Sequence, residues 1–249
     1  MNFLYILTLV IFAALYVAVI CLMKFMRNTA LTNAILMAAV LIPYVALSVT
    51  IYRDVGFYDW NFQNTLPVAN ASPFMFTCVP LALILPKRIR EHFLLLISLL
   101  SVGMLLSGTF GCIYNAVRNY KFHIHFTYDY MAHFALSLFG VYLVKSKQVT
   151  PSVKNALISS SVIVGAAAIM MILNVIFDTA FFGLSLNGKH NIYNVVLTDS
   201  SYLSALLYFF GLAVILTLGY LYCGLFNRNS AKKASAFRAP DRHAPCAHT

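Results

Sequence analysis

The chain has 249 residues, of which 61% are hydrophobic and 10% are charged, and its mean hydropathy is +0.81. These values exclude an ordinary water-soluble domain, in which about 25% of residues are charged. The formal net charge of +10 would suit nucleic acid binding in a soluble chain, but here the basic residues are sorted by loop. The composition therefore predicts a polytopic membrane protein with no nucleic acid partner.

Seven apolar runs are long enough to cross a hydrocarbon core of about 30 Å, which takes roughly 20 helical residues. We therefore predict an all-α fold, a bundle of seven transmembrane helices over residues 1–226, and a basic, disordered cytoplasmic tail over residues 227–249. We expect membrane lipids around it and the plasma membrane as its location, and the sequence does not predict an oligomeric state. The runs are residues 3–23, 29–51, 65–86, 92–113, 127–144, 154–177 and 200–226.

Lys and Arg are distributed unevenly between two sets of loops. The loops after the first, third and fifth runs, together with the tail, contain 13 of the 17 basic residues. The N-terminus and the other loops contain the remaining 4. Because cytoplasmic loops collect Lys and Arg, this distribution predicts an N-terminus outside and a C-terminus inside the cell.

The fifth run begins with a polar stretch that includes Asp129 and His133. These residues are four apart, so a helix places them on one face, roughly 6 Å from each other. A carboxylate can fix the tautomer of an imidazole and stabilise its charged form, which allows the imidazole to act as a general base. Alternatively, the two side chains satisfy each other and hold the fifth helix against a neighbour. Both roles are open at this point.

A general base needs a nucleophile, and the start of the third run offers the hydroxyls of Thr65 and Ser72 at a suitable depth. Asn70 lies between them and can donate a hydrogen bond to a developing oxyanion. Several prolines interrupt this run, and broken backbone at membrane depth is tolerated where it is buried in protein or lines a wet cavity. We therefore expect Asn70 and Ser72 to face an outward-opening polar pocket.

His123, His125, Asp129 and His190 could instead hold zinc or a similar cation, since imidazole and carboxylate groups are usual ligands. No HxxxH, HExxH or CxxC motif accompanies them. We therefore predict neither a metal nor a cofactor.

Three segments carry a family resemblance. Residues 60–67 end in Asn-Thr-Leu-Pro, residues 125–128 read His-Phe-Thr-Tyr and are followed by Ala132-His133, and residues 174–193 precede the last run. With these segments the chain resembles the YwaF-like family of bacterial integral membrane proteins, which are relatives of eukaryotic transmembrane acyltransferases and androgen-inducible fatty-ester hydrolases. The candidate ligand-binding residues lie in or beside them: Trp60, Asn64, Asn70, His125, Tyr128, Asn174, Asp178 and His190.

The resemblance implies acyl-group chemistry on lipids. His133 matches the family's histidine on the fifth helix, and Thr65 is the nucleophile that the resemblance suggests. The family pattern has a histidine and a cysteine shortly after Leu-Pro, whereas this chain has Ala69 and Ala71 there. This difference argues against catalysis by a thiol.

The sequence thus predicts a lipid acyltransferase or ester hydrolase that acts on a lipid or small molecule. His133 is the expected base, Asp129 orients it, and Thr65 or Ser72 is the nucleophile. One alternative is a non-catalytic receptor-like or accessory membrane protein that binds a ligand through its outer loops. Against a receptor, the chain has no Asp-Arg-Tyr motif after the third run and no NPxxY on the last. Another alternative is a small-solute transporter, which only the proline-rich third run favours.

Overall fold

The computed structural model describes residues 2–26, 30–55, 71–118, 122–177, 181–184 and 201–236. Over these ranges the chain is helical, with no strand, which confirms the all-α prediction for this part of the molecule. The elements in chain order are α1 (Phe3–Leu22), α2 (Ala30–Val55), α4 (Ala71–Ile84), α5 (Lys87–Arg118), α6 (Ile124–Lys145), α7 (Val153–Phe177), the 3₁₀ helix η1 (Phe181–Gly183) and α8 (Ser201–Ala236).

Five of the described helices, α1, α2, α5, α7 and α8, are long and apolar enough to cross a membrane. The chain is therefore an integral, multi-pass membrane protein. Helix α4 is apolar but shorter, and α6 is long enough but has a polar first half. The count of seven spans and the orientation of the two termini stay predictions.

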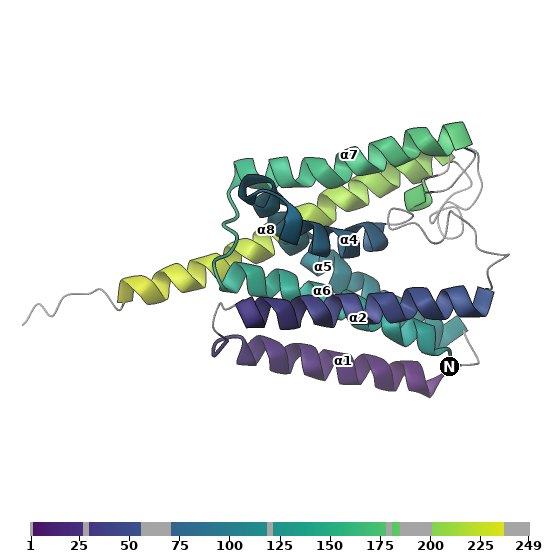
Figure 1. The fold of residues 1–249 in the computed structure, drawn as a ribbon, viewed down its shortest axis with the longest axis horizontal. Coiled ribbons are helices and arrows are strands. Elements are labelled where there is room, and N and C mark those ends of the chain that lie inside the picture. The colour runs from purple at the N-terminus through teal and green to yellow at the C-terminus, as the bar shows by residue number, and fades with distance from the viewer. Residues whose placement is uncertain are drawn as a thin grey trace, which may run out of the picture.

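Helix α5 lies at the centre of the bundle, where it packs against α1, α4, α6, α7 and α8. The helices run roughly along one common direction, and α8 extends beyond the end of the bundle (Figure 1). Leu96, Ile97 and Leu99 on α5 are completely buried. At Gly219 on α8, an added Cβ would overlap the carbonyl oxygen of Leu99, so only glycine permits this close approach of two backbones.

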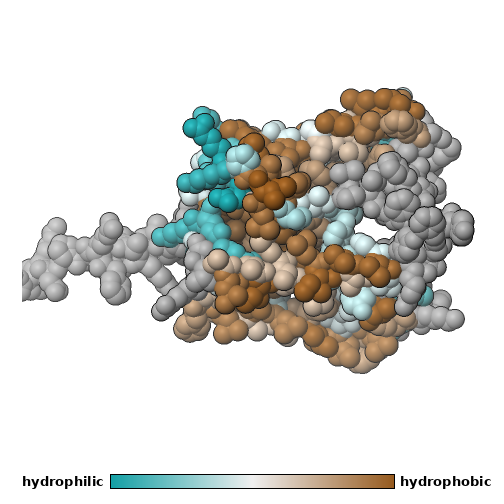
Figure 2. Space-filling model, in the orientation of Figure 1, coloured by the Kyte–Doolittle hydropathy of each residue, from teal (hydrophilic) through white to brown (hydrophobic). Residues whose placement is uncertain are grey.

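The outside of the bundle is strongly apolar. Large side chains such as Ile42, Ile84 and Phe177 are 67%, 78% and 64% exposed, far more apolar surface than a soluble monomer leaves in contact with water. Hydrophobic residues cover much of the face in Figure 2, whereas hydrophilic residues gather at the end from which α8 projects. Lipid chains are the natural solvent for such a surface.

Two helices continue past the boundaries that the apolar runs predicted. Helix α5 reaches Arg118 instead of residue 113, and α8 reaches Ala236, inside the segment predicted to be a disordered tail. Neither extension contains proline or glycine, so nothing in them interrupts the backbone hydrogen bonds of the helix. Residues 237–249 of the predicted tail lie outside the described residues.

Candidate functional site

Ser72 and His133 meet because their helices place them at the same depth. Helix α4 ends at Ile84, next to the basic turn at Lys87, and α6 ends at Lys145. At a rise of about 1.5 Å per residue, Ser72 lies roughly 18 Å along its helix from Ile84, and His133 lies roughly 18 Å from Lys145. Both side chains therefore lie at about the same distance from this end of the bundle.

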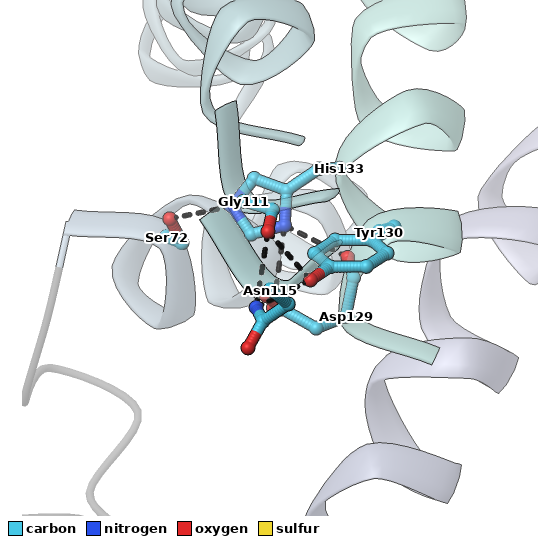
Figure 3. A network of polar contacts seen from close by, with 6 residues as sticks. All are labelled: Ser72, Gly111, Asn115, Asp129, Tyr130 and His133. Carbon is cyan, nitrogen blue, oxygen red and sulfur yellow. Dashed lines mark hydrogen bonds and ion pairs between the residues drawn. The ribbon is translucent and has the colours of Figure 1, made fainter. Parts of the chain in front are cut away.

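The side chains of Ser72 and His133, with the backbone oxygen and the carboxylate of Asp129, form a continuous polar chain, which we call the His133 network (Figure 3). The Nε2 atom of His133 lies 2.9 Å from the Ser72 Oγ. Its Nδ1 atom lies 2.8 Å from the backbone oxygen of Asp129 and 3.3 Å from the carboxylate Oδ1 of the same residue. His133 is only 4% exposed, whereas the Asp129 side chain is 36% exposed.

The partners of the two ring nitrogens assign the tautomer of neutral His133. A backbone carbonyl can only accept a hydrogen bond, so Nδ1 carries the proton and donates a hydrogen bond to the backbone oxygen of Asp129. Nε2 then has a free lone pair and accepts the hydroxyl hydrogen of Ser72. This is the arrangement in which an imidazole can remove a proton from a serine.

Apolar groups surround the imidazole ring. Phe76 on α4 packs edge-on against it, with ring centroids 5.5 Å apart. Gly108 on α5 lies so close that an added Cβ would be 3.2 Å from the His133 Cβ. These contacts restrict the rotation of the ring and limit the access of water, so the Ser72–His133 geometry is held from both sides.

Ser72 also lines a cavity of about 160 Å³ enclosed by α4, α5, α7 and α8. Most of the lining is apolar, with Met104, Leu212 and Ile215 among the residues, and Tyr208 adds a hydroxyl. The volume is close to that of an engineered apolar cavity of about 150 Å³ that binds benzene. The hydroxyl of Ser72 thus stands at the wall of a space that could take a short apolar group.

A second polar cluster, the Tyr130 network, joins Tyr130 on α6 to Gly111 and Asn115 on α5 (Figure 3). The Tyr130 hydroxyl donates to the Gly111 carbonyl over 2.8 Å, and the Asn115 amide donates to the Tyr130 hydroxyl over 2.5 Å and to Gly111 over 3.0 Å. The sequence prediction missed this network because it placed Asn115 in a loop. The spacing of Gly111 and Asn115, one helical turn apart, was the available signal.

The other predicted site residues are only partly covered by the described ranges. Thr65, Asn70, Trp60, Asn64, Asp178 and His190 lie outside the described residues, as does the side chain of His125. Tyr128 is half-buried on α6, and its binding role stays a prediction.

Asn174 is buried near the end of α7. Its amide nitrogen donates to the carbonyls of Phe181 and Leu184 over 2.9 and 3.2 Å, and its amide oxygen accepts from the Phe181 nitrogen over 2.7 Å. These bonds fix the connection around η1 against α7. The structure thus shows a structural role for Asn174, and the predicted ligand-binding role stays a prediction.

Among the described residues, no group of three or more His, Cys, Asp and Glu side chains could hold a metal ion. The zinc set considered from the sequence includes His190 and the side chain of His125, which lie outside that part of the chain.

Comparisons with known proteins gave no match: no protein-family model, no curated protein and no solved structure is similar to this chain. The resemblance to the YwaF-like family stays a prediction, so the case for a function rests on the geometry of the His133 network.

Proposed function

We propose that the chain is a membrane acyltransferase or ester hydrolase in which Ser72 is the nucleophile, His133 the general base and Asp129 the residue that orients His133. The observation that carries the proposal is the 2.9 Å contact between the Ser72 Oγ and the His133 Nε2. It lies within the range of about 2.6–3.2 Å expected of a nucleophile and its base. The buried imidazole and the adjoining cavity add to this support.

The reaction follows from the positions of these atoms. His133 Nε2 takes the proton of Ser72 as the Oγ attacks an ester carbonyl, and Asp129 stabilises the resulting imidazolium through Nδ1. Collapse of the tetrahedral intermediate forms an acyl-serine and expels an alcohol, which takes the proton from Nε2. Water or a second hydroxyl then attacks the acyl-serine, again with His133 as base, and restores Ser72.

The test uses the purified full chain in lipid nanodiscs. We expect a fluorophosphonate probe to label Ser72 and the protein to turn over at least one member of a panel of lipid esters. Ser72→Ala should abolish labelling, and both Ser72→Ala and His133→Ala should lower turnover by about 10³-fold or more. Ser107→Ala is the matched control because Ser107 lines the same cavity, and its activity should stay near that of the wild type.

Three other outcomes would change or overturn this proposal. Labelling that survives Ser72→Ala but disappears in Thr65→Ala would move the nucleophile to Thr65. Full activity in His133→Ala would rule out the proposed base. Wild-type protein that neither labels nor turns over any ester, while both variants lose thermal stability, would make the network structural and the proposal wrong.

A further inference from the structure

A different cavity, of about 340 Å³, lies at the basic end of the bundle. It is lined by residues of α2, α4, α5 and α6 and of the connection after α6. This volume is within the range of about 300–1,000 Å³ that small-molecule sites occupy. We call it the basic-end cavity. It is separate from the His133 network and plays no part in the proposed acyl chemistry.

The rim of the basic-end cavity carries two cations on one face of α5. Lys87 and Arg90 both line it, and residues three apart on a helix are neighbours. Among the residues that the structure describes, neither side chain forms an ion pair with a carboxylate. Glu91 also lines the cavity, so the rim has an excess of one positive charge. Because α5 begins at Lys87, the positive end of its dipole adds to the attraction for an anion.

Amide groups complete the polar side of the cavity. Gln148, in the connection after α6, donates through Nε2 to the Asn33 Oδ1 over 2.9 Å and to the Ser146 Oγ over 3.0 Å. These bonds fix the rim between α2 and α6. The cations therefore stand beside a polar edge whose shape is already set.

Other lining residues of the cavity are apolar, and one of them is also part of the apolar outer surface. Phe139 and Leu143 are 2% and 0% exposed and form a buried wall. Leu83 also lines the cavity and is 62% exposed on the apolar outer surface of α4. A free phosphate would use only the polar rim, whereas a phospholipid would use both the rim and this wall.

We propose that the basic-end cavity binds an anionic phospholipid, with the phosphate at Lys87 and Arg90 and the start of an acyl chain along Leu83. Basic pockets between helices on one side of a membrane commonly bind such headgroups. The charges and the apolar wall of the cavity match the two parts of this ligand. The ligand holds α2, α4, α5 and α6 together at this end of the bundle.

The experiment measures lipid binding to the delipidated full chain in detergent by native mass spectrometry. The probes are dioleoyl phosphatidylglycerol and dioleoyl phosphatidylcholine, which have the same acyl chains. We expect the wild type to retain phosphatidylglycerol preferentially. Near a membrane each Lys or Arg contributes about a fivefold gain in affinity, so K87Q/R90Q should bind phosphatidylglycerol about 10- to 30-fold more weakly. Phosphatidylcholine binding should not change.

The matched control is R88Q/K154Q, which removes the same charge from the same end of the bundle at two residues that do not line the cavity. It should bind phosphatidylglycerol as the wild type does. Equal losses in both double variants, or no loss in K87Q/R90Q, would overturn the proposal. Displacement of the lipid by millimolar inorganic phosphate would show a site for soluble phosphate and would also overturn it. The single variants K87Q and R90Q decide the question if the double variant does not fold.

Discussion

The two polar networks of α6 use the same kinds of groups but end differently. In the Tyr130 network, the hydroxyl, the amide and the Gly111 carbonyl all bond to one another, so the cluster closes on itself between α5 and α6. In the His133 network, the chain of hydrogen bonds runs from the half-exposed Asp129 through a buried imidazole to a hydroxyl at a cavity wall.

The difference separates a structural network from a candidate catalytic one. Polar groups inside a membrane protein must be satisfied, and the bonds among Gly111, Asn115 and Tyr130 do this between the packed helices α5 and α6. A network that ends at a cavity keeps one reactive atom available. Its other end reaches a charge that can be stabilised by solvent. Whether a polar network ends at a cavity therefore says more about function than whether it contains a histidine.

The largest expected effect that tests this comparison comes from Asp129→Asn. The amide removes the negative charge that stabilises the imidazolium, while the backbone carbonyl of Asp129 still accepts the hydrogen bond from Nδ1. We expect esterase or acyl-transfer turnover to fall by about 10²- to 10⁴-fold, with an unchanged circular dichroism spectrum. Turnover above half of the wild-type value would show that Asp129 does not orient the base.

Tyr130→Phe is expected to have a smaller effect, which lowers stability and leaves turnover nearly unchanged. The variant loses two hydrogen bonds in the closed network, and such bonds in membrane proteins are worth about 0.6 kcal/mol each. The free energy of unfolding in mixed micelles should fall by about 1 kcal/mol, while turnover stays within about twofold of the wild type. Tyr202→Phe is the control, since Tyr202 is 77% exposed. A large loss of turnover in Tyr130→Phe, with none in the control, would show that the two networks act as one site.

A modest effect on turnover is expected from Gly108→Ala. The added methyl group would lie 3.2 Å from the His133 Cβ and 3.4 Å from the Phe134 ring, so the imidazole must shift by a few tenths of an ångström. Since a displacement of about 1 Å can cost about 100-fold in rate, turnover should fall by a few-fold. Gly165→Ala is the control, because a Cβ there meets no atom within 4 Å. Equal turnover in the two variants would show that the position of His133 is not critical.

Helical periodicity was enough to pair Asp129 with His133, because residues four apart must share a face of a helix. The depth expected for Ser72 at the start of its apolar run was enough to make it a candidate nucleophile. Whether Ser72 faces His133 depends on the rotation of α4 about its axis. A helix that is apolar on all sides carries no signal for that rotation.

Other features could not be predicted because they depend on contacts distant in sequence. The bonds of Asn174 exist only once η1 has folded back against α7. The role of Asn115 required knowing that α5 continues past its apolar run, since hydropathy measures side chains and not backbone hydrogen bonds. The approach of Gly219 to Leu99 depends on how α5 and α8 cross.

The depth of Ser72 also bears on the fate of an acyl-serine. Its base is 4% exposed, and the hydroxyl is roughly 18 Å from the basic end of its helix. Water is scarce around a buried base, while lipids that carry a free hydroxyl reach the protein by lateral diffusion. Under the proposed mechanism, the ratio of transfer to hydrolysis is then set by local water activity. The same serine would act as a transferase in a dry bilayer and as a hydrolase in a thin or loosely packed one.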